Sequence, residues 1–313
     1  MRRQLVFVFI SLSLALQGAA LHAQETTPEP QPIRDPLQPP ALLRACSTDE
    51  LDEAAEILAG PALNFLGLEA LETENEIQIA QLAAAYDVLA LGQWHDLLPQ
   101  LPTCAEAFHY GTALGRYYDR NALLNIFNRV ARIYRSFGEM ETTSRYGQLI
   151  RDQRREMNAE TSALIDALQE DGALPSLEVT PVLSDCTSAE QATASEMLHP
   201  VAERYSELGG EVDTLLDQDR IALLEQYNEF ALGYWHDMFA TLPQCAKAVQ
   251  LGLYVGHTID STFIAIALTD ALLMEAQYGN DEMTALLAER LAQRTNAIAG
   301  EVAFFLTPLT DDP

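Results

Sequence analysis

The sequence predicts an all-α protein that consists of two tandem copies of an antiparallel helical-bundle module, each of roughly 140 residues and each closed by one disulfide. Three observations lead to this prediction. Apolar residues recur at helical spacing, a group of motifs repeats at a constant offset of 141 residues, and the four cysteines divide equally between the copies. Alternating strand patterns and Asn-Gly turns are nearly absent, which argues against a β protein.

The N-terminal residues predict export. Arg2 and Arg3 precede a short apolar run at 5–16, which is typical of a signal peptide over residues 1–23 and is too short to span a bilayer. The Pro-rich segment 24–44 predicts an extended linker. We therefore expect a protein of the periplasm or cell exterior, with no membrane insertion after signal cleavage.

The rest of the chain divides at a second break that contains Pro175 and Pro181. We place the first helical module at residues 45–170, a linker at 171–184 and the second helical module at 185–313.

Acidic residues outnumber basic ones by 46 to 18, which gives a formal net charge of -28. Such a field repels phosphate backbones, so we expect no nucleic-acid partner. Fingerprints for covalent haem, P-loop nucleotides, dinucleotides and serine hydrolases are absent from the sequence. We accordingly predict no catalytic residue, no cofactor and no metal, and we expect an unidentified protein or small-molecule partner.

The clearest repeated motif is Trp-His-Asp, which occurs as Trp94, His95 and Asp96 and again as Trp235, His236 and Asp237. About half of the 25 aligned positions around this motif are identical, where chance would give about one or two. Self-similarity at a fixed offset predicts repeated structural units.

Each copy has one early and one late cysteine, which predicts the pairs Cys46–Cys104 and Cys186–Cys245. An oxidising compartment favours disulfides, and there is no close C-x-x-C pair that would indicate a metal site. Four cysteines allow three pairings, and duplication of a self-contained unit selects this one.

The helices are expected in the same order in both copies. An amphipathic segment at 48–70, with its equivalent at 188–209, adjoins the first cysteine, and we expect Pro61 and Pro200 to interrupt it. The second helix ends near 98–100. Its apolar face in the first copy consists of Ile79, Leu82, Tyr86, Leu89, Gln93 and Leu97.

A third helix is expected to begin at Pro102 and at Pro243, because proline ends the preceding helix and suits a first helical turn. Gly138 and Gly279 are predicted C-caps. The remaining predicted helices are, in order, 120–137, 140–168, 262–278 and 281–305.

The helix after each Leu-Pro has small residues spaced four apart. This stripe consists of Ala107, Gly111 and Gly115 in the first copy and of Ala248, Gly252 and Gly256 in the second. Small residues let another element approach closely, at the expense of helix propensity. We expect close packing inside each module, with an interface between modules or chains as the alternative.

The Trp-His-Asp motif is predicted to form a structural corner. Consecutive helical residues point about 100° apart, so His95 and Asp96 cannot easily face one ion together. We expect Trp94 to anchor the core and Asp96 to cap the next helix near Thr103 and Cys104. The same is expected of the second copy, and a ligand or metal site at these corners is the alternative.

Basic residues concentrate between Arg116 and Arg155. We expect a solvated, salt-bridged helix face there, and the alternatives are docking on the acidic second module and binding of an acidic partner. Two Glu-x-x-His pairs fall at non-equivalent places, and we interpret them as unrelated surface pairs: Glu106 with His109, and Glu196 with His199.

The spacing Trp-x7-Pro-x-Cys-Ala, at residues 94–105 and 235–246, is similar to a motif of uncharacterised exported bacterial helical-repeat proteins that have no assigned activity. The resemblance covers one helix–turn–helix per copy and implies architecture only. We expect a non-enzymatic extracytoplasmic interaction or scaffold protein. The alternatives are a metal- or small-ligand-binding protein that uses the inter-module crevice or the Trp-His-Asp corners, and an unrecognised hydrolase.

Overall fold

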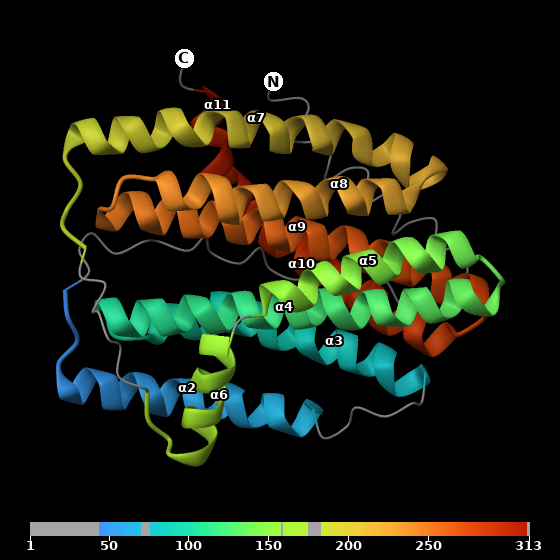
Figure 1. Cartoon of the computed structure of the whole chain (residues 1–313), viewed down its shortest axis with the longest axis horizontal. Coiled ribbons are helices and arrows are strands. Elements are labelled where there is room, and N and C mark those ends of the chain that lie inside the picture. The colour runs from blue at the N-terminus through green and yellow to red at the C-terminus, as the bar shows by residue number, and fades with distance from the viewer. Residues whose placement is uncertain (1–43, 70–75, 158, 175–182, 312–313) are drawn as a thin grey trace.

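A computed structural model describes residues 44–69, 76–157, 159–174 and 183–311, and within these ranges the chain forms helices and no strand (Figure 1). The predicted all-α class is confirmed. We call residues 44–174 the first half and residues 183–311 the second half. The predicted signal peptide, nearly all of the Pro-rich linker, and the central part of the linker between the halves lie outside the described residues.

The two halves have the same order of main elements. The first half contains α2 (Thr48–Glu69), α3 (Glu76–Gly92), a π turn (Gln93–Leu97), a 3-10 turn (Leu98–Gln100), α4 (Ala105–Ser136), α5 (Met140–Glu156) and α6 (Ala159–Glu170). The second half contains α7 (Ser188–Gln218), α8 (Arg220–Gly233), a π turn (Tyr234–Met238), a 3-10 turn (Phe239–Thr241), α9 (Ala246–Tyr278), α10 (Asp281–Glu301), a π turn (Val302–Leu306) and α11 (Thr307–Asp311).

The expected breaks at Pro61 and Pro200 are wrong, because α2 and α7 continue through both prolines. Proline removes one backbone hydrogen bond, but burial of the apolar face on both sides of it holds the helix together. In α2 the buried side chains on either side of Pro61 include Leu58 and Phe65, and in α7 they include Leu198 and Tyr205 around Pro200.

The expected helix boundaries near residue 120 and residue 262 are also wrong. The helix that follows each Leu-Pro continues without a break, so α4 and α9 are the two longest helices. No glycine or proline between 116 and 136 would end α4. The segment predicted as one helix at 140–168 is instead divided between α5 and α6, and Met157 after α5 has an extended conformation.

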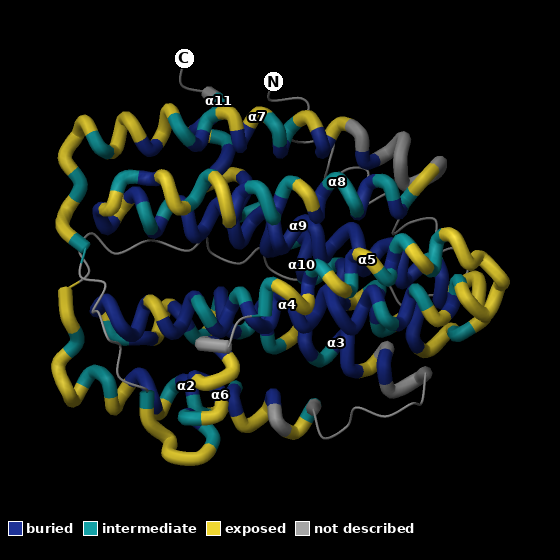
Figure 2. Tube along the Cα trace, in the orientation of Figure 1, coloured by how far each residue is buried: buried dark blue, intermediate teal, exposed yellow. Residues whose placement is uncertain are grey.

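The long helices α4 and α9 pack against each other and form the centre of the protein (Figure 1). From this pair the helices stack outward as α3 and α2 on one side and as α8 and α7 on the other. Figure 2 shows α4 and α9 mostly buried and the outer helices exposed along one face. One apolar core therefore contains side chains from both halves.

Among the described helices, only α9 is long and apolar enough to cross a membrane by length and composition, but 89% of its apolar window is buried inside the protein. Its burial follows from its place at the centre, against α4, α8 and α10. Core helices that are apolar on all sides have the same composition.

Two disulfides, Cys46–Cys104 and Cys186–Cys245, join the segments before α2 and α7 to the starts of α4 and α9, as predicted. Disulfides are typical of oxidising, extracytoplasmic compartments. At the other ends of the central helices, Gly138 and Gly279 have φ angles of +82° and +81°. Gly279 is the C-cap of α9, as predicted, whereas the C-cap of α4 is Phe137 and the left-handed Gly138 follows it.

Candidate metal centre

The Trp-His-Asp motif lies in a π turn in both halves, directly after α3 and after α8. The three side chains diverge there, as the angular spacing of consecutive residues predicts. Trp94 is fully buried, the His95 side chain is 3% exposed and faces the second half, and Asp96 is exposed. π turns are rare and occur frequently at functional sites.

Main-chain carbonyls accept the N–H groups of Cys104 and Cys245, where we expected Asp96 and Asp237 to cap the central helices. The N–H of Cys104 donates to the Pro102 carbonyl at 2.8 Å, and the N–H of Ala105 donates to the Arg44 carbonyl at 2.7 Å. The second half repeats both bonds: the N–H of Cys245 donates to Pro243 and the N–H of Ala246 donates to Ser184, at 2.9 and 2.8 Å. In each half, the segment that the disulfide holds in place, at Arg44 or Ser184, therefore satisfies one of these two donors.

In each half, the stripe of small residues lets the tryptophan of that half pack directly against the central helix. A Cβ atom built on Gly115 would lie 2.5 Å from Trp94 Cε2, and one built on Gly111 would lie 2.5 Å from Leu101 Cδ1. Gly256 is equally tight against Trp235, and Gly252 against Leu242. Ala107 and Ala248, which complete the stripe, are buried at its start.

Each buried indole donates a hydrogen bond to an aspartate on the central helix of its own half. The bond from Trp94 Nε1 to Asp119 Oδ2 is 2.8 Å long, and the bond from Trp235 Nε1 to Asp260 Oδ2 is 3.0 Å long. Both carboxylates are fully buried. We did not predict these two aspartates from the sequence, although Asp119 and Asp260 are identical residues at the repeat offset of 141.

Each tryptophan also carries a cationic side chain from the opposite half. The His257 ring stacks on Trp94, with centroids 4.1 Å apart, and the Arg116 Cζ atom lies 3.8 Å from the centroid of Trp235. His257 and Arg116 are again 141 positions apart. The contact between the halves is therefore reciprocal, as in a two-fold symmetric dimer.

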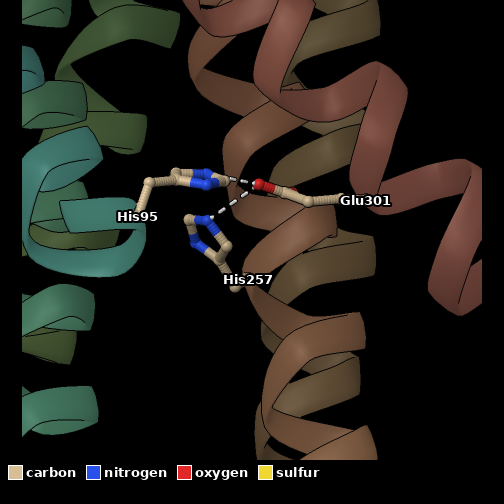
Figure 3. A group of neighbouring side chains, drawn as sticks. All are labelled: His95, His257 and Glu301. Carbon is tan, nitrogen blue, oxygen red and sulfur yellow. Dashed lines mark ion pairs between the residues drawn. The ribbon is translucent and has the colours of Figure 1, made fainter. Parts of the chain in front are cut away.

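Three ionisable side chains from different elements converge beside the stacked pair. They are His95 from the first π turn, His257 from α9 and Glu301 at the end of α10 (Figure 3). His95 Nε2 lies 2.8 Å and His257 Nε2 lies 3.3 Å from Glu301 Oε1. One candidate ligand atom from each residue falls within 4.8 Å of the others, and the side chains are at most 3% exposed.

Glu301 forms buried ion pairs with both imidazoles. Apart from these ion pairs, both nitrogens of His95, Nε2 of His257 and both oxygens of Glu301 are buried without another hydrogen-bond partner. The three side chains thus converge on one place, with the Glu301 carboxylate facing both imidazoles (Figure 3). Buried polar groups of this kind call for an explanation, such as an ion.

Asp119 lies behind His257 and fixes the orientation of its ring. The distance from Asp119 Oδ2 to His257 Nδ1 is 3.3 Å, and Asp119 also accepts from Arg294 Nη1 at 3.3 Å. A carboxylate on one imidazole nitrogen leaves the other nitrogen directed at the cluster, as in carboxylate–histidine–metal groups.

The charges in the cluster are strongly coupled. Burial alone would lower the pKa of His257, but Glu301 and Asp119 outweigh burial and raise that pKa to about 9. Burial alone would raise the pKa of Glu301, but His257 and His95 hold it well below its usual range. Without a metal ion, His257 is therefore an imidazolium beside a carboxylate at neutral pH.

Buried ion pairs join the two halves, both next to the cluster and farther along the central helices. Arg294 contacts Asp87 at 2.7 Å, and Arg120 contacts Asp260 at 3.0 Å. Arg129 pairs with Glu275, also across the halves. Several arginines of the basic stretch thus dock on the second half, which was one of the alternatives, and the expected solvated face is wrong for these positions.

The two Glu-x-x-His pairs do not contribute to the cluster. Glu106 accepts from the Cys46 N–H at 2.8 Å, and His199 Nε2 lies 3.4 Å from Glu203. Comparison of the chain with protein-family models, with curated proteins and with solved structures finds no match.

Proposed function

We propose that this protein binds one divalent transition-metal ion of the zinc class through His95 Nε2, His257 Nε2 and Glu301. The observation that carries the proposal is the convergence of three buried ligand atoms, from both halves of the chain, within 4.8 Å of one another. This was the alternative that the repeated corners left open. The ligands themselves come from one corner and from two residues of the second half.

The donor set suits this class of metal. Imidazole nitrogens with a carboxylate favour zinc and its neighbours in the first transition row. Donors about 2.0–2.1 Å from a tetrahedral ion lie about 3.3 Å apart. The separation of His257 Nε2 from Glu301 Oε1 is 3.3 Å, and the 2.8 Å from His95 Nε2 requires a small outward movement. The second oxygen of Glu301 could supply a fourth donor.

The role that the burial supports is structural and non-enzymatic. Catalytic zinc sites keep a position open to water and substrate, whereas these ligands are almost inaccessible. An ion held by His95 of the first half and by two residues of the second half would join the halves. Zinc at 1,000 times its Kd would add about 4 kcal/mol to the free energy of unfolding.

The proposal includes the architecture and location expected from the sequence. We propose that the halves are tandem copies of one module, because the indole–aspartate bonds and the cation–indole contacts recur at the offset of 141. We propose further that an exported interaction or scaffold protein uses the ion to hold its two modules in one rigid arrangement. Both disulfides support a place outside the cytoplasm.

Zinc content and thermal stability test the metal site together. The protein is unfolded with chelator, refolded at pH 8 with or without zinc, and freed of excess metal. Unfolding gives the ion access to the buried ligands, and pH 8 eases loss of the His257 proton. We expect one zinc per chain and a higher Tm with zinc than without.

The variants His95→Gln and Glu301→Gln identify the ligands, and His236→Gln is their matched control at the exposed second corner. We expect the first two to lose zinc and the zinc-dependent rise in Tm, and the control to keep both. Absence of zinc from the refolded wild type would overturn the proposal and leave a metal-free ion pair as the role of the cluster.

A further inference from the structure

A histidine–glutamate pair at the other corner resembles the pair of His95 with Glu301 in the first cluster. His236 Nε2 lies 3.0 Å from Glu156 Oε1 and 3.1 Å from Oε2, which compares with 2.8 Å between His95 and Glu301. Glu156 is the last residue of α5, and Glu301 is the last residue of α10. The two clusters thus draw their carboxylates from the ends of corresponding helices.

Three further positions of the clusters correspond at the offset of 141. The tryptophan is Trp94 or Trp235, the orienting aspartate is Asp119 or Asp260, and the side chain that stacks on the indole is His257 or Arg116. The carboxylates do not correspond at the offset of 141. The position equivalent to Glu156 is Ala297, one helical turn before Glu301, and the position equivalent to Glu301 is Glu160, in α6.

We propose that this corner is a second metal site of the same zinc class, in which His236, Glu156 and position 116 are the three ligand positions. Because position 116 is an arginine in this chain, its guanidinium blocks the site and no metal binds there. This inference rests on the proposed function of the first cluster. An arginine side chain stays protonated and has no lone pair for a metal, so it cannot act as a ligand. The positive charge of Arg116 takes the place of the ion beside the carboxylates of Glu156 and Asp260.

The surroundings of Arg116 support its role as a fixed cation. Its charge interacts with those of Asp260 and Glu156, and its Cζ atom lies 3.8 Å from the centroid of the Trp235 ring in a cation–π contact. Its Nε atom is buried and has no hydrogen-bond partner. Charge interactions and the cation–π contact therefore hold the Arg116 side chain in place, without a hydrogen bond from Nε. Arg116 lies on Trp235 as His257 lies on Trp94 in the first cluster.

The two sites differ in access. The His236 side chain is 62% exposed, whereas that of His95 is 3% exposed. An ion in the second site would therefore face solvent and exchange faster than one in the first. Position 116 decides whether the chain holds one ion or two.

The test is the number of zinc ions bound by Arg116→His, measured by native mass spectrometry after the refolding described above. We expect two zinc ions in this variant and one in the wild type. Arg116→Leu is the matched control, since it removes the cation without adding a ligand, and it should bind one. Addition of Glu156→Gln to Arg116→His should return the count to one.

The reverse variant, His257→Arg, keeps the proposal testable if Arg116→His fails to fold. It should bind no zinc at either site yet fold, because an arginine over the corresponding tryptophan is already accommodated at Trp235. One zinc in both the wild type and folded Arg116→His would overturn this inference and keep the first site. No zinc in the wild type would overturn the proposed function, whatever the variant binds. A His257→Arg chain that does not fold would also count against the equivalence of the two positions.

Discussion

The imidazole of His257 and the indole of Trp94 stack with their centroids 4.1 Å apart and their planes 21° apart, although they belong to opposite halves of the chain. Asp119 closes a triangle with them, because it accepts from Trp94 Nε1 at 2.8 Å and lies 3.3 Å from His257 Nδ1. The imidazole is thus fixed on its face and on one edge. Only its Nε2 edge remains, and it points at His95 and Glu301.

The seat of Trp94 on α4 predicts a large effect of a small substitution. Gly115→Ala adds a methyl group at a point 2.5 Å from Trp94 Cε2, so the indole or the helix must shift. Overpacking of this kind costs about 1–3 kcal/mol, which exceeds the gain of about 1 kcal/mol in helix propensity. We expect a lower free energy of unfolding, measured by urea denaturation.

Gly210→Ala is the matched control for this substitution. Gly210 lies in α7, is exposed, and has nothing within 4 Å of the added methyl group. It should stabilise the protein by up to about 1 kcal/mol. Equal effects at Gly115 and Gly210 would contradict the packing account.

Arg294 should contribute far more to stability than Arg145, a partly exposed arginine that also pairs across the halves. Arg294→Met leaves the buried carboxylates of Asp87 and Asp119 without one of their cations, and loss of one member of a buried pair costs about 3–5 kcal/mol. Arg145→Met removes a partly exposed pair with Glu225, which should cost at most about 1 kcal/mol. Chemical denaturation measures the free energy of unfolding of both variants. Equal losses in the two variants would contradict this prediction.

Each disulfide should stabilise the fold by restricting the unfolded chain. The bonded cysteines are 58 and 59 residues apart, for which loop entropy gives about 4 kcal/mol per bond. The double variants Cys46→Ser/Cys104→Ser and Cys186→Ser/Cys245→Ser should therefore each lose about 2–5 kcal/mol. Peptide mapping without reduction gives an independent check, and a bond between the halves would contradict the pairing.

Buried tyrosines predict a cooperative loss of structure at high pH. Burial, reinforced by Asp270 and by Asp260, raises the pKa of Tyr146 and Tyr234 well above 10. A raised pKa in the folded state means that the neutral phenol contributes stability at every pH below the unfolded pKa of about 10. That contribution is lost as the pH rises above about 10.

Absorbance of tyrosinate at 295 nm and helical circular dichroism measure the two sides of this linkage. The late part of the absorbance rise should coincide with the loss of helix. Full ionisation of the tyrosines while the helical signal is intact would show that these phenols are not held in the core.

The sequence predicted the parts of this structure that depend on local chemistry. Helical periodicity, the left-handed cap at Gly279 and the paired cysteines all involve near neighbours or a repeated pattern. Helix length was harder, because Pro61 looks like a break until the apolar contacts on both sides of it are known. Tertiary packing overrode propensity there.

The candidate metal centre could not be assembled from the sequence. Its three ligands are separated along the chain by more than 150 residues (His95 to His257) and by more than 40 residues (His257 to Glu301). The repeat did, however, contain a usable signal in Asp119 and Asp260. The sequence also shows that position 257 is a histidine where the equivalent position 116 is an arginine. Only the stacking of both side chains on tryptophans gives this difference a meaning.

The exchange of cations between the halves has a consequence for how the chain can be divided. A fragment that ends before α7 would lack the imidazole that covers Trp94 and the guanidinium that neutralises Asp87. The complementary fragment would lack the arginines that face Asp260 and Glu275. Two such fragments produced separately should recognise each other and reassemble, which makes the connection after α6 a natural place at which to split the protein into a complementing pair.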